Sequence, residues 1–409
     1  MDDIGREYVV LGLAVGELQE GVVDSYFGPE ELREEAVASK ASANKLVKDI
    51  AALRERARAA DIDAQRARWL DRQLIGLGTI ARKLDGEDFD YVTEVELCFD
   101  ATPTATPSET YAEVRRRLDD LLPPGSSLND RLEERNNRMT IAPQRVLEIL
   151  NWVTEELRSL CAPVFPIPEG DSLEISVVTD EPWAAYNWYE GGRRSRIEFN
   201  TDQPTRAHAL VGILGHEAFP GHHLEHASKE QRLVEEQGRV ESSVQLINTP
   251  EAYISEGLAE VGPRLLVGKE LWQEMLLAIC ERAGIKITAA DAARDWEITQ
   301  ALRLLRGSGG DAALMLHAEG RSRDEVNQFL IDEALRTPDQ AEKSFAFLMH
   351  PLWRTYSFCY AGGEKLLTEW IDAAGDEPGK RARFQRLLTE QLTPSGISAE
   401  LASDGEAQP

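Results

Sequence analysis

The stretch LGHEAFPGHHLEHA, residues 214–227, decides how this chain is interpreted. It begins like the pattern H-E-x-x-H, in which two histidines one helical turn apart can bind the same zinc ion. Pro220 occupies the place of the second histidine, and proline removes a helical hydrogen bond and crowds the turn before it. On a straight helix, neither His222 nor His223 would meet His216 at the same face and height. A bulge of two residues at the Pro-Gly pair would bring His222 to the ligand position, so the sequence predicts a relocated metal site.

The histidines of the chain are strongly clustered. Five of the seven lie within 19 residues: His208, His216, His222, His223 and His226. A catalytic zinc site needs a third protein ligand and an open position. Further along, EAYISEGLAEVG (251–262) places Glu256 and Glu260 one turn apart on one helix face. We therefore predict Glu256 as the third ligand and Glu260 as the residue that orients a histidine ligand. The alternative is an exposed acidic helix face without a metal.

Helical patterns dominate the chain, so a mainly α fold is expected. The exception is residues 172–200, where SLEISVVTD (172–180) and SRIEF (195–199) alternate apolar with polar residues. These two segments predict a small antiparallel β-sheet just before the metal-binding helix, joined through an aromatic, glycine-rich segment.

We find no linker that would separate independent domains, and one catalytic domain over residues 1–400 is expected. The expected parts are an N-terminal helical part (1–165), a small β-sheet part (166–205), a helical part with the metal site (206–400) and a disordered tail (401–409).

Composition narrows the classes of partner. The formal net charge is −27, which disfavours nucleic acid and anionic membranes. The N-terminus lacks a basic and apolar signal segment, and no apolar run approaches the roughly 20 residues of a bilayer span. The four cysteines are widely separated, as in reduced, packed cysteines. We expect a cytoplasmic protein without nucleic-acid or membrane partners, and the sequence leaves a homodimer open.

The motif HEAFPGHHLEH followed by YISEGLAE resembles the bacterial domain-of-unknown-function 885 family, with its H-E-x-x-P-G-H-H signature. That family is similar in fold to the carboxypeptidase Taq peptidases of the Glu-zincin group. The resemblance implies a large helical, zincin-like metallopeptidase body, and it favours His222 over His223 as ligand. GDAALMLHAEGRSRDEVNQFL (310–330) and YAGG (360–363) are similar to two further family segments, and they mark His317 and Tyr360. Leu258 departs from the family pattern, where a tryptophan is usual.

Together these features predict a zinc-dependent hydrolase, a carboxypeptidase-like metallopeptidase acting on a peptide or small amide. One Zn²⁺ per chain would be held by His216, His222 and Glu256, with Glu217 as general base.

The other predicted roles are oxyanion stabilisation by Tyr360 and His317, support of the ligands by Glu260 and His223, and binding of a substrate carboxylate by His350 and Arg354. Helix-end packing and a surface charge are the alternative for the last two. The segment SRIEF could also pair with an extended peptide along its edge.

Two other functions stay open from the sequence. One is a metallohydrolase for non-peptide amides or esters, which would use the same ligands. The other is a non-catalytic helical binding protein, although such a protein has no need of the base Glu217.

Overall fold

The computed structural model describes residues 2–181 and 183–407 of the 409-residue chain. The α-helices are α1 (Asp3–Gly16), α2 (Glu30–Ser39), α3 (Ala43–Ala59), α4 (Ala64–Leu84), α5 (Tyr91–Phe99), α6 (Ser108–Leu121), α7 (Leu128–Arg138), α8 (Pro143–Cys161), α9 (Leu210–Glu217), α10 (His222–Lys229), α11 (Pro250–Leu266), α12 (Lys269–Ala283), α13 (Ala289–Arg303), α14 (Ser308–Ala313), α15 (Arg323–Asp332), α16 (Pro338–Met349), α17 (Ser357–Asp372), α18 (Glu377–Thr389) and α19 (Pro394–Ala407). The strands are β1 (Val23–Tyr26), β2 (Ser172–Val178), β3 (Ala185–Gly191), β4 (Arg194–Asn200) and β5 (Val244–Leu246). The prediction of a mainly α fold is confirmed.

Local signals explain where several helices begin. The side chain of Asp90 accepts a hydrogen bond from the backbone N–H of Thr93 and so caps α5. Thr288 and Asp291 form a capping box at the start of α13. Pro143 is the first residue of α8, where its missing N–H costs no helical hydrogen bond.

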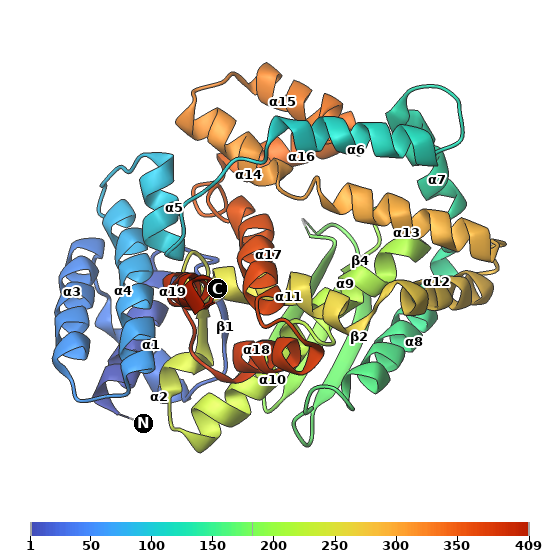
Figure 1. The fold of residues 1–409 in the computed structure, drawn as a ribbon. Coiled ribbons are helices and arrows are strands. Elements are labelled where there is room, and N and C mark those ends of the chain that lie inside the picture. Colours follow the sequence, from blue (N-terminus) through green and yellow to red (C-terminus); the bar gives the residue numbers. More distant parts are fainter. Residues whose placement is uncertain (1, 182, 408–409) are drawn as a thin grey trace.

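Two apolar cores lie on either side of the helix pair α11 and α17. The N-terminal helices α1–α5 share one core with residues 312–359. The second core joins α8, α9, α12 and α18. A smaller third core lies between α6, α7 and α13. Helices α11 and α17 contribute side chains to the first two cores and lie near the centre of the molecule (Figure 1). These two helices therefore connect the N-terminal half to the half that holds the histidines.

A glycine contact lets α11 and α17 cross closely. A Cβ added to Gly257 would lie 2.7 Å from the carbonyl carbon of Gly363, and one added to Gly363 would lie 2.6 Å from the carbonyl oxygen of Tyr253. Any larger residue at either position would force the two backbones apart. The crossing brings Glu256 on α11 next to the start of α17, where Tyr360 lies.

The small sheet before the metal-binding helix differs from the prediction. It has three strands in the order β2–β4–β3, and β2 pairs with β4 in parallel. Only the pair β3–β4 is antiparallel. The aromatic segment expected to be a connector is itself the strand β3, and this extra strand reverses the chain once more before β4 begins. As a consequence β4 is the central strand, so SRIEF has no free edge for a peptide.

A second, two-stranded sheet has no counterpart in the prediction. Strand β1 pairs with β5 in an antiparallel register, which brings residues 23–26 next to residues 244–246. Since the two strands are more than 200 residues apart in sequence and β1 has only four residues, no local pattern announces the pairing. β1 also lies beside β3.

The predicted disordered tail is partly wrong. Helix α19 continues to Ala407, while residues 408 and 409 lie outside the described part of the chain. Ile397 of this helix is buried in the second core, which explains why its first turns are ordered. The four cysteines are all buried and unpaired, as expected.

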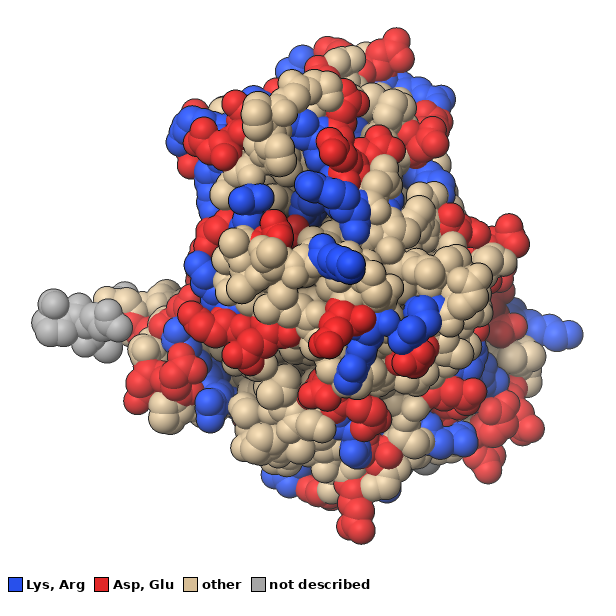
Figure 2. Space-filling view, turned by 90° about the vertical axis from the view of Figure 1, so that its right-hand side faces the viewer, with Lys and Arg blue, Asp and Glu red and all other residues tan. Residues whose placement is uncertain are grey.

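The surface is mixed in charge in spite of the net charge of −27. Figure 2 shows lysine and arginine side chains interspersed with aspartate and glutamate over one face of the molecule. Among the described residues, no helix is both long and apolar enough to cross a membrane.

Candidate metal centre

The turn between α9 and α10 contains the two-residue bulge that the sequence predicts. Helix α9 ends at Glu217, and α10 begins at His222. Across the gap, the N–H of Gly221 donates to the carbonyl of Gly215 at 3.0 Å, and the N–H of Leu224 donates to that of Ala218 at 3.3 Å. Both bonds span six residues instead of the four of an α-helix, so two extra residues fit into one turn.

Only a glycine fits at position 221, because the turn leaves no space for a Cβ atom. A Cβ on Gly221 would lie 1.8 Å from the carbonyl oxygen of His216, a distance that no side chain can occupy. The absence of a side chain therefore allows the backbone to fold back onto the end of α9.

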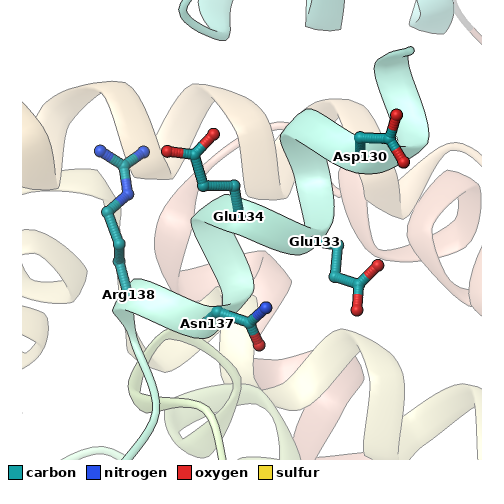
Figure 3. Close-up of a pocket in the computed structure, with 5 residues that line it drawn as sticks. All are labelled: Asp130, Glu133, Glu134, Asn137 and Arg138. Atoms are coloured by element: carbon teal, nitrogen blue, oxygen red, sulfur yellow. The ribbon is translucent and has the colours of Figure 1, made fainter. Parts of the chain in front are cut away.

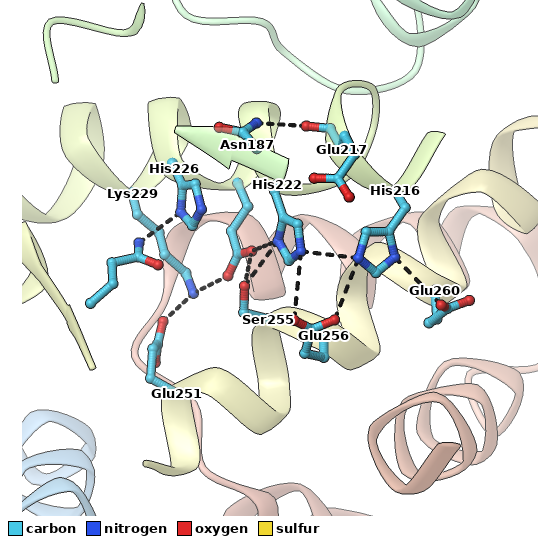
Figure 4. Close-up of polar contacts among 12 residues, drawn as sticks. Asn187, His216, Glu217, His222, His226, Lys229, Glu251, Ser255, Glu256 and Glu260 are labelled. Atoms are coloured by element: carbon cyan, nitrogen blue, oxygen red, sulfur yellow. Dashed lines mark hydrogen bonds and ion pairs between the residues drawn. The ribbon is translucent and has the colours of Figure 1, made fainter. Parts of the chain in front are cut away.

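The bulge brings His216 and His222 together above Glu256, with their imidazole rings at 90° to each other (Figure 4). Their Nε2 atoms are 3.2 Å apart. Nε2 of His216 lies 3.4 Å from Oε2 of Glu256, and Nε2 of His222 lies 3.9 Å from Oε1 of the same residue. All three side chains are mostly buried, and one ligand atom from each lies within 4.8 Å of the others.

This arrangement fits one metal ion. Two ligand atoms about 2.1 Å from a tetrahedral zinc ion are about 3.4 Å apart, close to the separations found here. Within the described part of the chain, the buried Oε2 of Glu256 has no hydrogen-bond partner, which is costly for a carboxylate oxygen without a cation. The three residues therefore place their donor atoms around one point, at separations that suit a single metal ion.

The partners of the other imidazole nitrogens support the same conclusion. Nδ1 of His216 lies 3.4 Å from a carboxylate oxygen of Glu260. Nδ1 of His222 lies 3.2 Å from the hydroxyl of Ser255, which itself donates to Glu225 at 2.6 Å. If each Nδ1 carries the proton that it donates to these acceptors, both Nε2 atoms present lone pairs to each other. Two facing lone pairs repel unless a cation lies between them.

The local charges also favour a cation. Burial works against protonation of His216 and His222, but nearby carboxylates outweigh it, and the pKa of each histidine is raised. For His216 the main carboxylates are Glu256 and Glu217. Burial by itself would raise the pKa of Glu256, but the two histidines outweigh burial, and the pKa of Glu256 is lowered. A site that draws a proton in this way will also attract a divalent cation.

A buried ion-pair network, which we call the Lys229 network (Lys229, Glu225, Glu251), lies next to His222, since Nδ1 of His222 is 3.5 Å from Oε2 of Glu225. Figure 4 labels Lys229 and Glu251 of this network. Nζ of Lys229 donates to Glu225 at 2.7 Å and also contacts Glu251. Glu251 in turn accepts from the indole N–H of Trp69 on α4 at 2.7 Å. Burial opposes ionisation of Glu225, but Lys229 outweighs it and holds the pKa of Glu225 far below its usual range.

Glu225 also belongs to a second grouping of residues that could hold a metal, with His222 and His226. This grouping is the weaker one for two reasons. Glu225 is already neutralised by Lys229, and Nδ1 of His226 lies 2.7 Å from the amide nitrogen of Gln245. Burial lowers the pKa of His226 to about 3. We assign His226 to packing beside the metal centre.

The metal centre opens into a large cavity of about 1650 Å³, to which Glu217 and Tyr360 both contribute. Figure 4 shows the Glu217 carboxylate pointing towards His216 and His222, and the amide of Asn187 holds the Glu217 carbonyl at 2.6 Å. Burial raises the pKa of Glu217, as suits a group that must take up a proton near neutrality. The ring of Tyr360 stacks on His216 with 6.4 Å between ring centres.

Tyr356 is a neighbour of the site that the sequence analysis missed. Its hydroxyl donates to Oε1 of Glu256 at 2.7 Å and leaves Oε2 facing the histidines. Tyr356 precedes Tyr360 by one helical turn, so the spacing of the two tyrosines could have suggested it. Ser255 and the Lys229 network were also missed, although Ser255 directly precedes the predicted ligand Glu256.

The structure does not place His317 and Arg354 among the residues that line this cavity. Nε2 of His317 lies 2.9 Å from the carbonyl of Leu348, and its ring stacks on Tyr91. Arg354 forms an ion pair with the buried Glu94. Both side chains are therefore engaged in packing α5 against residues 314–354, and their predicted roles in catalysis and substrate binding are not supported. His350 does line the cavity.

His223 points away from the metal centre. It is fully buried, with Nδ1 2.8 Å from the hydroxyl of Ser195 and Nε2 3.5 Å from Asp171. It thus joins α10 to the three-stranded sheet, and the prediction that it supports the ligands is wrong. Glu260, by contrast, lies beside His216 as predicted.

A second hollow, on helix α7, is a shallow surface feature without the buried, convergent ligand atoms of the metal centre. Its lining residues are Asp130, Glu133, Glu134, Asn137 and Arg138 (Figure 3). All five are exposed and come from a single helix. It is a solvated polar surface.

Comparison with known proteins finds similarity in structure at low sequence identity. No protein-family model matches the chain, and no curated protein matches it by sequence. The predicted membership of the domain-of-unknown-function 885 family therefore stays a prediction.

Among solved structures, a protein from Colwellia psychrerythraea described as a "putative lipoprotein" has a TM-score of 0.56 and 13% identity, over 92% of this chain and 70% of that chain. A "putative lipoprotein of unknown function" from Shewanella oneidensis has a TM-score of 0.48 and 11% identity, over 97% and 82% of the two chains. An M32 carboxypeptidase from Deinococcus radiodurans R1 has a TM-score of 0.41 and 15% identity, over 99% and 94%. The first shares its fold with this chain, while scores below 0.5 do not establish a common fold. Function must therefore be argued from the site itself.

Proposed function

We propose that this protein is a zinc-dependent hydrolase that cleaves peptide bonds. One observation carries the proposal: two histidine nitrogens and the unpartnered oxygen of Glu256 converge on one point at the wall of a large cavity, with the Glu217 carboxylate beside them. A purely structural metal site would not need an acid–base group or an open cavity.

The metal would be held by His216, His222 and Glu256. When bound, zinc would supply Lewis acidity and would lower the pKa of a water in the site towards about 7. Glu217 would take the proton of the attacking water and pass it to the leaving amine, and its raised pKa suits both steps. The Tyr360 hydroxyl would donate a hydrogen bond to the oxyanion that develops on the substrate carbonyl.

The predicted carboxypeptidase-like preference has weaker support. It came from the family resemblance, with Arg354 and His350 as the residues that would bind a terminal carboxylate. Arg354 instead pairs with Glu94, and only His350 faces the cavity. Our proposal therefore specifies the reaction and the bond type, without a preference for the carboxyl end of the substrate.

The test combines metal content with turnover. Wild-type protein and Glu217→Gln are purified without chelators, their zinc content is measured by elemental analysis, and both are incubated with a set of peptides, non-peptide amides and esters. We expect about one zinc per chain in both proteins and peptide cleavage by wild type that falls roughly 10²–10⁴-fold in the variant.

Other results would point elsewhere. Cleavage of esters or non-peptide amides alone would indicate a different metallohydrolase. Failure of the wild type to take up zinc, manganese or cobalt would contradict the metal mechanism and leave a helical binding protein.

A further inference from the structure

Four carboxylates outside the metal centre and the Lys229 network, none of them used by the mechanism above, also line the cavity: Glu20, Asp24, Asp180 and Glu181. Asp24 on β1 lines the cavity together with Tyr186 on β3, and the Tyr186 hydroxyl donates a hydrogen bond to Asp24. Asp24 is partly buried, and among the described residues no lysine, arginine or histidine pairs with it. The hydroxyl that donates to this partly withdrawn carboxylate is neutral, so in the described part of the chain Asp24 has no directly paired cationic side chain.

The basic residues of the cavity do not supply that charge. Three arginines and one lysine line it, and each arginine already has an acidic partner. The pairs are Arg135 with Asp295, Arg303 with Glu364, and Arg306 with Glu260. Lys343 is exposed. The cavity thus has a free carboxylate in its interior and no free arginine.

The wall next to Asp24 is aromatic. The ring of Tyr186 lies 5.2 Å from that of Trp183 and 4.6 Å from that of Trp188, measured between ring centres. Aromatic faces attract ammonium and guanidinium groups and also pack against their methylene chains. The wall already holds one such cation, since the guanidinium of Arg196 lies 5.7 Å from the Trp188 ring centre.

We propose that Asp24, oriented by Tyr186, binds a positively charged amino or guanidino group of the substrate in the cavity beside the metal centre. This inference rests on the proposed function, because it names the substrate class of the same site. The charged group is either the free α-ammonium of a peptide or the side chain of a lysine or arginine. The protein would then select its peptides by a cation, in contrast to the carboxylate selection predicted from the sequence.

The experiment uses four dipeptide amides as probes: Lys-Ala amide, norleucine-Ala amide and the N-acetylated form of each. Norleucine replaces the lysine side chain by a neutral one of similar size, and acetylation removes the α-ammonium. Binding to the zinc-loaded wild-type protein is measured by calorimetry, and cleavage is measured in parallel by mass spectrometry. The same series is run with Asp24→Asn and with Glu20→Gln.

Asp24→Asn keeps the size of the side chain and its ability to accept from Tyr186. Glu20→Gln is the matched control, because Glu20 is an exposed carboxylate at the same cavity and its loss changes the net charge by the same amount. Thermal unfolding of each variant checks that the fold is retained.

The wild type should prefer at least one cationic probe over its neutral counterpart by about tenfold or more, as expected for a charge-assisted hydrogen bond. Asp24→Asn should reduce the ratio of the affinities for the cationic and the neutral probe to below about two, while Glu20→Gln should keep most of the wild-type preference. The pair of probes that shows the preference identifies the source of the cation. A loss on acetylation indicates the α-ammonium, and a loss with norleucine indicates the side chain.

The proposal is overturned if the wild type shows no preference among the four probes, if it binds none of them, or if both variants lower the ratio equally. In the last case the preference would come from the overall negative field. Cation-selective binding through Asp24 without any cleavage would instead contradict the proposed peptidase reaction and leave the binding inference intact.

Discussion

Two buried polar regions of this molecule use the same residue types with opposite results. In the metal centre, His216 and His222 face each other and Glu256 keeps an oxygen without a partner. In the second region, which we call the Glu94 cluster (Glu94, Lys83, Arg354, His317), Glu94 receives both Lys83 and Arg354, and His317 interacts with a backbone carbonyl.

The difference shows what separates a functional site from a structural one. Both regions contain a buried glutamate and at least one histidine. In the Glu94 cluster the chain itself neutralises the carboxylate, so nothing more needs to bind. In the metal centre the donor atoms converge without a cation from the chain, and they face a cavity. Residue type alone therefore does not mark the site, whereas an unsatisfied, convergent set of donors does.

The largest effect is expected for His222→Ala, which removes one of the three proposed ligands of the metal centre. Removal of one of three ligands should reduce bound zinc from about one per chain to a small fraction of that, measured by elemental analysis after dialysis. His223→Ala is the neighbouring control, since His223 contacts Ser195 and Asp171 instead. It should keep its zinc although the protein becomes less stable. Equal metal loss in both variants would contradict the assignment of His222.

Tyr360→Phe tests whether the metal centre is catalytic, through the proposed hydrogen bond from Tyr360 to the oxyanion. We expect kcat to fall about 10²–10³-fold on a cleaved peptide because one oxyanion donor is lost, with zinc content unchanged. Tyr356→Phe provides the contrast, because its hydroxyl holds Glu256 and its loss should weaken zinc binding. A metal-replete Tyr360→Phe with normal kcat would remove this tyrosine from the mechanism.

Lys229→Met tests whether the carboxylates next to the metal centre depend on a cation from the chain, as Glu94 does. The change leaves Glu225 and Glu251 buried without Lys229, so the free energy of unfolding should fall by about 3–5 kcal/mol in denaturant titrations. Zinc affinity should also drop about 10–100-fold, because Glu225 and Ser255 orient His222. The double variant Lys229→Met with Glu251→Gln should recover part of the stability. A single variant as stable as wild type would show that the network is dispensable.

The smallest effect is expected for His317→Gln in the Glu94 cluster. Zinc content and turnover should stay at the wild-type level, because His317 does not line the cavity. Burial lowers the pKa of His317, so the folded protein keeps it neutral while the unfolded chain takes up a proton below about pH 6.5. This difference costs stability as the pH falls through 6.5, by at most about 1.4 kcal/mol per pH unit.

The variant His317→Gln should therefore lose less stability than wild type between pH 7 and pH 5, measured by denaturant titration at each pH. A loss of zinc or of turnover in this variant would restore the role that the family resemblance implies for His317.

The metal centre was largely predictable because its signals are local. The Pro-Gly pair within a histidine cluster required a bulge, and the observed six-residue hydrogen bonds place His222 where that bulge predicts. Glu256 and Glu260 share one face of a helix, a relation that follows from the helical period alone. That these residues bind zinc remains a prediction.

The errors have a common physical cause. His317, Arg354 and the edge of SRIEF were assigned to the cleft from sequence, yet their positions depend on which distant segment packs against them. Arg354 meets Glu94, 260 residues earlier in the chain, and SRIEF is enclosed by β2 on one side and β3 on the other. Such contacts carry no periodicity and no spacing rule.

The sequence by itself determined the mainly helical class, the bulged turn at Pro220 and the approach of His222 to His216, because these depend on backbone geometry over a few residues. Only the tertiary structure decided which oxygen of Glu256 stays free, which arginines are already paired, and that Asp24 from the N-terminal part lies beside the cavity. The physical reason is that hydrogen-bond valence and charge are balanced over the whole fold, so an unsatisfied donor or acceptor is recognised only after every other contact is in place.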